Sequence, residues 1–178
     1  MNGFRQFVEA RGGGVKRVHY SRFDDLAPRD TPQVGSSDKP RGIWYACDER
    51  WELFVAQGEM YGKDDPDSFY NRRKPTMEHK FLLTLDMSKM LVLDSEYKVE
   101  NFTHTYVDRS MSRYNLIDWK RVAERYSGVE CCPYFRELRE YYMWYVGWDV
   151  PSGCVWDAGA VQKVEKLSQP PFPGRNRY

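Results

Sequence analysis

The order of apolar and polar positions predicts two strands and a helix in the first third of the chain. Residues 15–20 alternate with a period of two, which is typical of a half-buried strand. Residues 42–47 are almost continuously apolar, which favours a buried strand, and residues 49–57 carry apolar side chains at helical spacing. Between the two strands, residues 24–41 are rich in Pro, Gly, Ser and Asp, which predicts a long loop.

Strands and helices continue to alternate through the middle of the chain. Residues 79–86 and 90–94 are rich in Leu, Phe and Val, which predicts two central strands of a sheet. Ser95 and Asp118 have side chains suited to capping the N-termini of two helices, and Gly128 would close the second helix. Helices therefore alternate with strands in this part of the chain.

The last third of the chain combines an aromatic stripe with two further strands. After Pro133, apolar side chains recur at i, i+3, i+4 and i+7, which predicts a helix with one face turned to the core. The stripe consists of Leu138, Tyr141, Tyr142 and Tyr145. Residues 153–157 and 160–165 are typical of closing strands, and residues 169–178 form a Pro-rich tail.

Composition indicates that these elements form one folded domain. The chain has 178 residues, of which 41% are hydrophobic and 16% aromatic, and this is too apolar for a disordered protein. We expect one α+β domain over residues 1–168, with residues 58–78 as a charged surface insertion. No apolar run is long enough for a membrane span, and the N-terminus lacks the pattern of a signal peptide. Four cysteines without paired spacing favour a reducing, cytoplasmic location.

Residues that could take part in catalysis or ligand binding lie in three short segments. His19-Tyr20-Ser21 ends the first predicted strand, residues 39–45 (KPRGIWY) open the second, and residues 148–157 (WDVPSGCVWD) come near the end. This order resembles the ADP-ribosyltransferase superfamily in its diphtheria-toxin-like branch. In that branch a first-strand His and a second-strand Tyr hold NAD, and a late acidic residue serves the chemistry.

The resemblance implies a split β-sheet core with flanking helices and NAD as co-substrate. It implies that His19 and Tyr45 act in catalysis together with an acidic residue, and that Tyr45 stacks on nicotinamide. The triplet that contains His19 has Tyr where many relatives have Gly, so the approach of the backbone to the ligand differs at this position. The implied NAD-binding residues are His19, Tyr20, Ser21, Gly42, Trp44 and Tyr45.

These residue types suit the cleavage of NAD on general chemical grounds. A neutral imidazole offers one hydrogen-bond donor and one acceptor, which is enough to bind a ribose hydroxyl and a backbone group together. An aromatic ring offers a flat face for nicotinamide. As the bond between nicotinamide and ribose breaks, the ribose carbon becomes oxocarbenium-like, and a nearby carboxylate stabilises the developing charge.

Two aspartates are candidates for that carboxylate, because the usual Glu of the family is absent between Tyr141 and Gly159. We favour Asp149, since it precedes a Pro-Ser-Gly turn where a loop facing the pocket would meet the last strands. Asp157 is the alternative. Ser152 in the same turn could assist by hydrogen bonding.

The expected activity is transfer of ADP-ribose from NAD to a protein or nucleic-acid acceptor, as in small bacterial or phage toxins and effectors. An antitoxin or inhibitor protein would be a partner of such a toxin. Two alternatives stay open: an NAD glycohydrolase, and a non-enzymatic binding module on the same fold. No metal site is expected, because His79 and His104 lack acidic or cysteine neighbours at ligand spacing. The net charge of +1 gives no overall attraction for nucleic acid.

Overall fold

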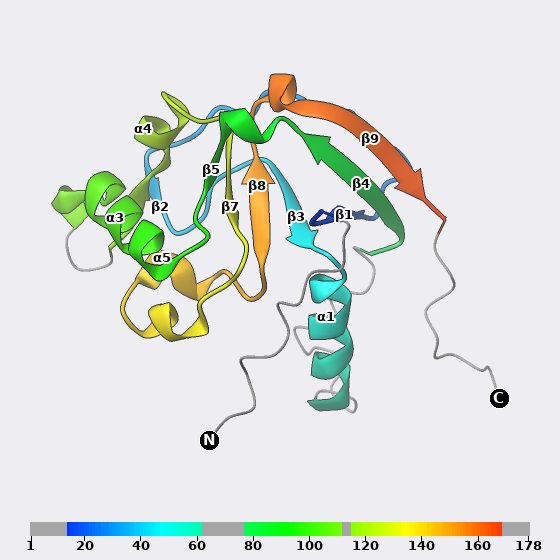
Figure 1. The fold of residues 1–178 in the computed structure, drawn as a ribbon, viewed down its shortest axis with the longest axis horizontal. Helices are drawn as coiled ribbons and strands as arrows, with labels where there is room; N and C mark the ends of the chain where they lie inside the picture. Colours follow the sequence, from blue (N-terminus) through cyan, green and yellow to red (C-terminus); the bar gives the residue numbers. More distant parts are fainter. Residues whose placement is uncertain (1–13, 62–76, 112–114, 169–178) are drawn as a thin grey trace.

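A curled sheet of seven strands forms the centre of the computed structural model, which describes residues 14–61, 77–111 and 115–168 (Figure 1). In spatial order the strands are β5 (Met90–Val92), β7 (Gly128–Cys131), β8 (Ser152–Val155), β3 (Ile43–Cys47), β1 (Arg17–Ser21), β4 (His79–Leu85) and β9 (Val161–Leu167). β5 and β7 run parallel, and the other neighbouring pairs of this sheet run antiparallel. A separate short pair joins β2 (Ser36–Ser37) to β6 (Ile117–Asp118).

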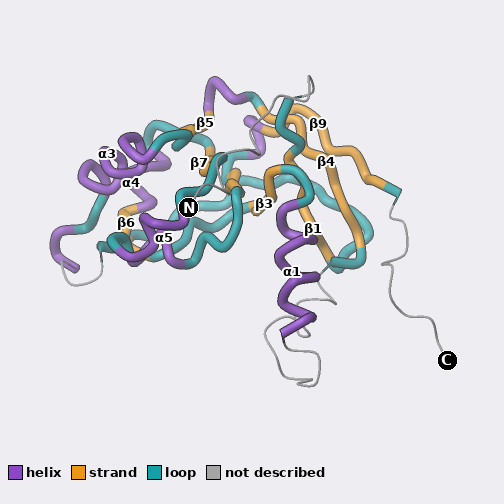
Figure 2. The backbone as a smooth tube through the Cα atoms, turned by 60° about the horizontal axis from the view of Figure 1, so that its bottom comes forward, coloured by secondary structure: helices purple, strands orange, loops and turns teal. Residues whose placement is uncertain are grey.

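The helices divide into a group beside β5 and β7 and a single helix that follows β3. Among the described residues, the α-helices are α1 (Arg50–Tyr61), α3 (Glu96–Tyr106), α4 (Trp119–Ala123) and α5 (Met143–Val146). Figures 1 and 2 place α3, α4 and α5 together, with α1 at a distance from them. Phe102, Trp119 and Trp144 come from the three grouped helices, and their ring centroids lie 5.1–6.0 Å apart. Their burial against the sheet makes this the main core.

Two helices begin at the side chains that the sequence predicts. Ser95 Oγ accepts a hydrogen bond from the backbone N–H of Lys98 at 3.3 Å, at the start of α3. Asp118 Oδ1 accepts from the N–H of Arg121 at 3.3 Å, at the start of α4. Each bond satisfies one of the amide groups that a helix leaves free at its N-terminus. Both predicted caps are confirmed.

Two expectations for the middle of the chain are wrong. The strand formed by Met90–Val92 lies at the edge of the sheet rather than in its centre. Gly128 does not close α4, which ends at Ala123, but begins β7. A Cβ at residue 128 would fall 2.6 Å from the sulfur of Met90 and 2.7 Å from the carbonyl oxygen of Cys154. Glycine therefore allows β7 to pack closely between its neighbours.

The aromatic stripe after Pro133 does not form one continuous helix. A short 3-10 helix, Arg136–Glu140, is followed by the separate α5. Leu138 and Tyr145 are buried as expected, but 69% of Tyr141 is exposed. The interruption turns the stripe residues in different directions, so their helical spacing does not produce one apolar face.

The observed class is a mixed α+β single domain, as the sequence predicts. The predicted strands at residues 15–20, 42–47 and 79–86 correspond to β1, β3 and β4. The tail at residues 169–178 and most of the charged insertion at 58–78 lie outside the described residues. Within the described part of the chain, no helix combines the length and apolar character that a membrane span requires.

Candidate functional site

The sheet opens between β1 and β3 at His19. The register pairs Arg17 with Cys47 and Val18 with Ala46, and the pairing of the two strands ends there. β1 stays paired with β4 as far as Ser21. At His19, β1 is therefore still paired with β4 on one side but is no longer paired with β3 on the other.

A cavity of about 500 Å³ lies at this opening. β1, β3, α1 and the loop between α5 and β8 all contribute to its lining. Aromatic side chains supply much of the wall, and the rings of Trp44 and Trp148 meet edge to face at 4.9 Å. The polar and large aromatic residues of the lining include His19, Tyr20, Lys39, Trp44, Trp51, Trp148, Asp149 and Ser152.

His19 is held in one orientation by the backbone of β3. Its Nδ1 lies 2.6 Å from the carbonyl oxygen of Trp44. Because a carbonyl only accepts, Nδ1 carries the proton and donates this bond, which leaves Nε2 as an acceptor. Burial lowers the pKa of His19 below its usual value, against the opposing effect of the bond to Trp44. The imidazole is therefore neutral at pH 7 and can accept a hydrogen bond.

The two candidate aspartates have different surroundings in the structure. Asp149 lines the cavity with His19, its side chain is 26% exposed, and its carboxylate lies 3.8 Å from Nη2 of Arg139. Asp157 does not line the cavity. It accepts hydrogen bonds from Ser127 Oγ and from the N–H of Gly159, both at 2.7 Å, and these bonds lower its pKa. Asp157 thus caps a turn, and Asp149 is the one of the two aspartates that lines the cavity.

Tyr45 borders the cavity but directs its phenol to the opposite face of the sheet from Trp44. Consecutive strand residues point to opposite faces, and the two side chains belong to different core clusters. Only 2% of Tyr45 is exposed. Its ring lies over Gly153, where any side chain would collide with it. The expected stacking of nicotinamide on Tyr45 does not fit this placement, because the ring is packed within the protein.

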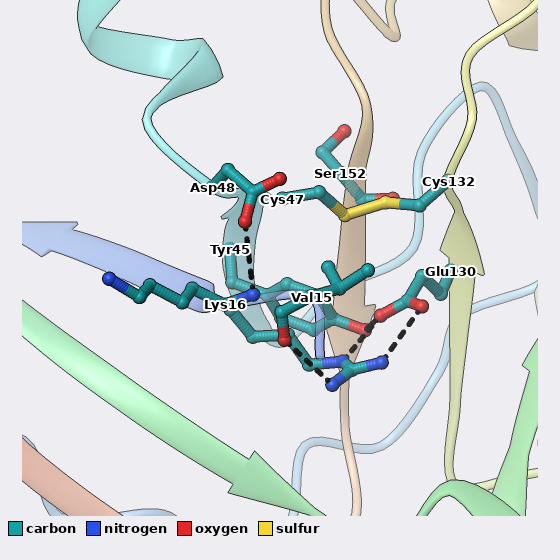
Figure 3. Close-up of polar contacts among 9 residues, drawn as sticks. Val15, Lys16, Tyr45, Cys47, Asp48, Glu130, Cys132 and Ser152 are labelled. Atoms are coloured by element: carbon teal, nitrogen blue, oxygen red, sulfur yellow. Dashed lines mark hydrogen bonds and ion pairs between the residues drawn. A yellow bond between two sulfur atoms is a disulfide. The ribbon is translucent and has the colours of Figure 1, made fainter. Parts of the chain in front are cut away.

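The Tyr45 hydroxyl belongs to a buried polar cluster on β1, β3 and β7 (Figure 3). It donates to Glu130 Oε2 at 3.0 Å. Arg17 donates to the same carboxylate twice, from Nε at 2.6 Å and from Nη2 at 3.0 Å. Glu130 is only 3% exposed, and burial of Tyr45 together with the proximity of Glu130 raises the pKa of Tyr45. We call Arg17, Tyr45 and Glu130 the buried carboxylate cluster.

Sequence reasoning missed Glu130, although a signal was present. An acidic residue stands alone between Val129 and Cys131 in an otherwise apolar run, and a buried charge usually has a partner. The run is only four residues long and follows a predicted helix end, so β7 was not expected there. Without that strand, Glu130 could not be placed opposite Tyr45.

The remaining predicted NAD-binding residues have different positions. Tyr20 and Trp44 line the cavity, whereas Ser21 and Gly42 do not. Ser21 Oγ accepts a hydrogen bond from the N–H of Phe23 at 2.9 Å, which stabilises the turn after β1. Gly42 has a φ of 147°, and a Cβ there would collide with the carbonyl oxygen of Val155. Its role is to let β3 start close to β8.

Cys47 and Cys132, which are 85 positions apart, form a disulfide, whereas the cysteine spacing favours reduced cysteines. It links the end of β3 to the residue after β7, beside the start of β8 (Figure 3). With Glu130 these cysteines form a group of the kind that holds metal ions. The two sulfurs are bonded to each other and the carboxylate is bonded to Arg17, so none of the three groups is free to bind a metal ion.

Comparison with models of protein families, with curated proteins and with solved structures finds no match to this chain. The geometry of the cavity is therefore the basis for a functional conclusion. That geometry combines a neutral imidazole, aromatic walls, one lysine and one carboxylate around a single opening in the sheet.

Proposed function

We propose that this protein binds NAD in the cavity and transfers ADP-ribose to a macromolecular acceptor with release of nicotinamide. One observation supports the proposal most directly: His19, the tryptophan walls and Asp149 surround the same cavity, although more than a hundred positions separate the first from the last. The pairing of β1 with β3 ends before His19 within one continuous seven-stranded sheet, and a split sheet of the ADP-ribosyltransferase type stays a prediction.

His19 and the tryptophans would bind the nicotinamide riboside end of NAD. Nε2 of the neutral His19 accepts a hydrogen bond from a ribose hydroxyl, while Nδ1 stays bonded to Trp44. The indole face of Trp44, which is only partly buried, replaces the expected face of Tyr45 as the surface for the nicotinamide ring. Tyr45 then acts indirectly, by linking β3 to β7 across β8 through Glu130.

Asp149 would serve the bond cleavage. The bond between the ribose carbon and the nicotinamide nitrogen breaks, and its electron pair leaves with nicotinamide. The carboxylate of Asp149 stabilises the positive charge that develops on the ribose. An acceptor nucleophile then bonds to the same carbon and loses its proton to the carboxylate or to solvent. The acceptor is a protein or a nucleic acid in this proposal, and an inhibitor protein would act by covering the cavity.

Incubation with labelled NAD, with and without a cell lysate, tests this function. Release of nicotinamide together with label on protein or nucleic acid is the expected result. Free ADP-ribose as the sole product would instead identify a glycohydrolase. A thermal shift with NAD but no nicotinamide release would indicate a binding module, and the absence of both would exclude NAD as the ligand.

We predict that NAD affinity depends on the protonation of His19. Because its pKa is lowered, the neutral acceptor form predominates at pH 7 and above, so the Kd should be constant there. As the pH falls through the pKa of His19, below the usual value of about 6.5, Nε2 gains a proton and affinity should fall. Titrations of NAD from pH 5 to 8 measure this profile.

The His19→Gln variant separates this effect from general acid sensitivity. Glutamine keeps an acceptor oxygen but does not titrate, so the acidic loss of affinity should disappear. His104→Gln is the matched control, because His104 is exposed on α3 and does not line the cavity. An unchanged acid profile in His19→Gln would show that another group controls binding.

A further inference from the structure

We infer that Lys39 binds a phosphate group of the ligand and makes the cavity prefer phosphorylated nicotinamide compounds to the unphosphorylated riboside. This inference rests on the proposed function and adds a determinant of substrate choice. It follows from the position of the Lys39 side chain, from the charges around the cavity and from the order of groups in NAD.

Gly147 has no side chain, and this leaves space for the Lys39 side chain along the cavity wall. A Cβ at Gly147 would fall 2.6 Å from Cε and 3.4 Å from Nζ of Lys39, so the lysine passes where residue 147 has no side chain. Its Nζ lies 5.3 Å from the centre of the Trp44 ring. The ammonium group is therefore held beside the aromatic wall that we assign to nicotinamide.

The charges around the cavity leave Lys39 available to an anion. Asp149 has Arg139 at 3.8 Å, and His19 is neutral at pH 7. Among the described residues, no carboxylate lies within ion-pair distance of Lys39. Several other lysines have such partners, in the pairs Lys80–Glu52, Lys89–Asp86, Lys98–Asp94, Lys163–Glu165 and Lys166–Asp24.

The chemistry of NAD supplies an anion at a suitable point. In NAD the diphosphate is attached to the ribose that carries nicotinamide. If nicotinamide lies on the tryptophan wall and its ribose contacts His19, the diphosphate therefore lies next to that ribose. A lysine is a compact positive charge that binds phosphate without requiring a fixed geometry. Lys39 would thus contact the part of the ligand that distinguishes a nucleotide from a nucleoside.

The test compares nicotinamide mononucleotide with nicotinamide riboside, because the two differ only by the phosphate. Their Kd values are measured by calorimetry on the full chain, the Lys39→Gln variant and the Lys120→Gln variant. Lys120 is exposed on α4 and does not line the cavity, so its variant removes the same charge elsewhere. Melting temperatures of the three proteins establish that each variant is folded.

The full chain should bind the mononucleotide roughly tenfold more tightly than the riboside at low salt. Lys39→Gln should remove most of this preference, Lys120→Gln should keep it, and higher salt should weaken it in the full chain. A preference that survives in Lys39→Gln would overturn the inference and leave the proposed function standing. If no nicotinamide compound binds the full chain, both are overturned.

Discussion

The Asp149→Asn variant should cleave NAD about 100- to 1,000-fold more slowly than the wild type and bind it with nearly the same Kd. The amide keeps the size of the carboxylate and one acceptor oxygen, so the ground-state complex should change little. The negative charge matters when the ribose becomes cationic, which happens only as the bond to nicotinamide breaks. Rates of nicotinamide release and calorimetric titration with NAD measure the two effects separately.

Asp157→Asn is the matched control for this prediction. Asp157 accepts bonds from Ser127 and Gly159 and lies outside the cavity, so we expect a loss of about 1 kcal/mol in stability and little change in cleavage rate. An active Asp149→Asn variant beside an inactive Asp157→Asn variant would reverse our assignment. Equal, small effects of both changes would place the required carboxylate elsewhere.

Local patterns predict the strands β1, β3 and β4 and the starts of two helices, because each depends on neighbours in sequence. Alternating side chains specify β1, and the hydroxyl of Ser95 can reach an amide only three positions away. β7 escapes this reasoning because it is four residues long and is stabilised by strands from distant parts of the chain. Whether such a short segment forms a strand depends on its pairing with distant strands rather than on its own sequence.

Reasoning from sequence is limited in the same way for the individual residues of the site. Sequence order brings His19 and Asp149 together as candidates, and the structure places both at one cavity. Strand alternation puts Trp44 and Tyr45 on opposite faces, but the sequence does not say which face carries the cavity. Both aspartates lie beside turns, and only the three-dimensional contacts of Asp157 reveal its capping role. The catalytic roles themselves stay predictions.

Glu130→Ala should destabilise the protein by about 3–5 kcal/mol, because it breaks a buried ion pair from one side. The side chains of Arg17 and Glu130 are 16% and 4% exposed, so the charge left on Arg17 would have little access to water. The hydroxyl of Tyr45 would lose its acceptor as well. Urea unfolding of the purified variant at pH 7 measures the loss of free energy.

Two further variants distinguish the ion pair from simple packing. Replacing both partners, as Arg17→Met with Glu130→Leu, should recover much of the stability, since apolar pairs often replace buried ion pairs without loss. Tyr45→Phe should cost only about 1 kcal/mol and leave NAD cleavage nearly intact, because Arg17 still holds the carboxylate and only 2% of Tyr45 is exposed. A loss below 1 kcal/mol in Glu130→Ala would show that the buried carboxylate cluster does not stabilise the sheet. Loss of NAD binding in a fully stable Tyr45→Phe variant would show that the Tyr45 hydroxyl contributes to the ligand site.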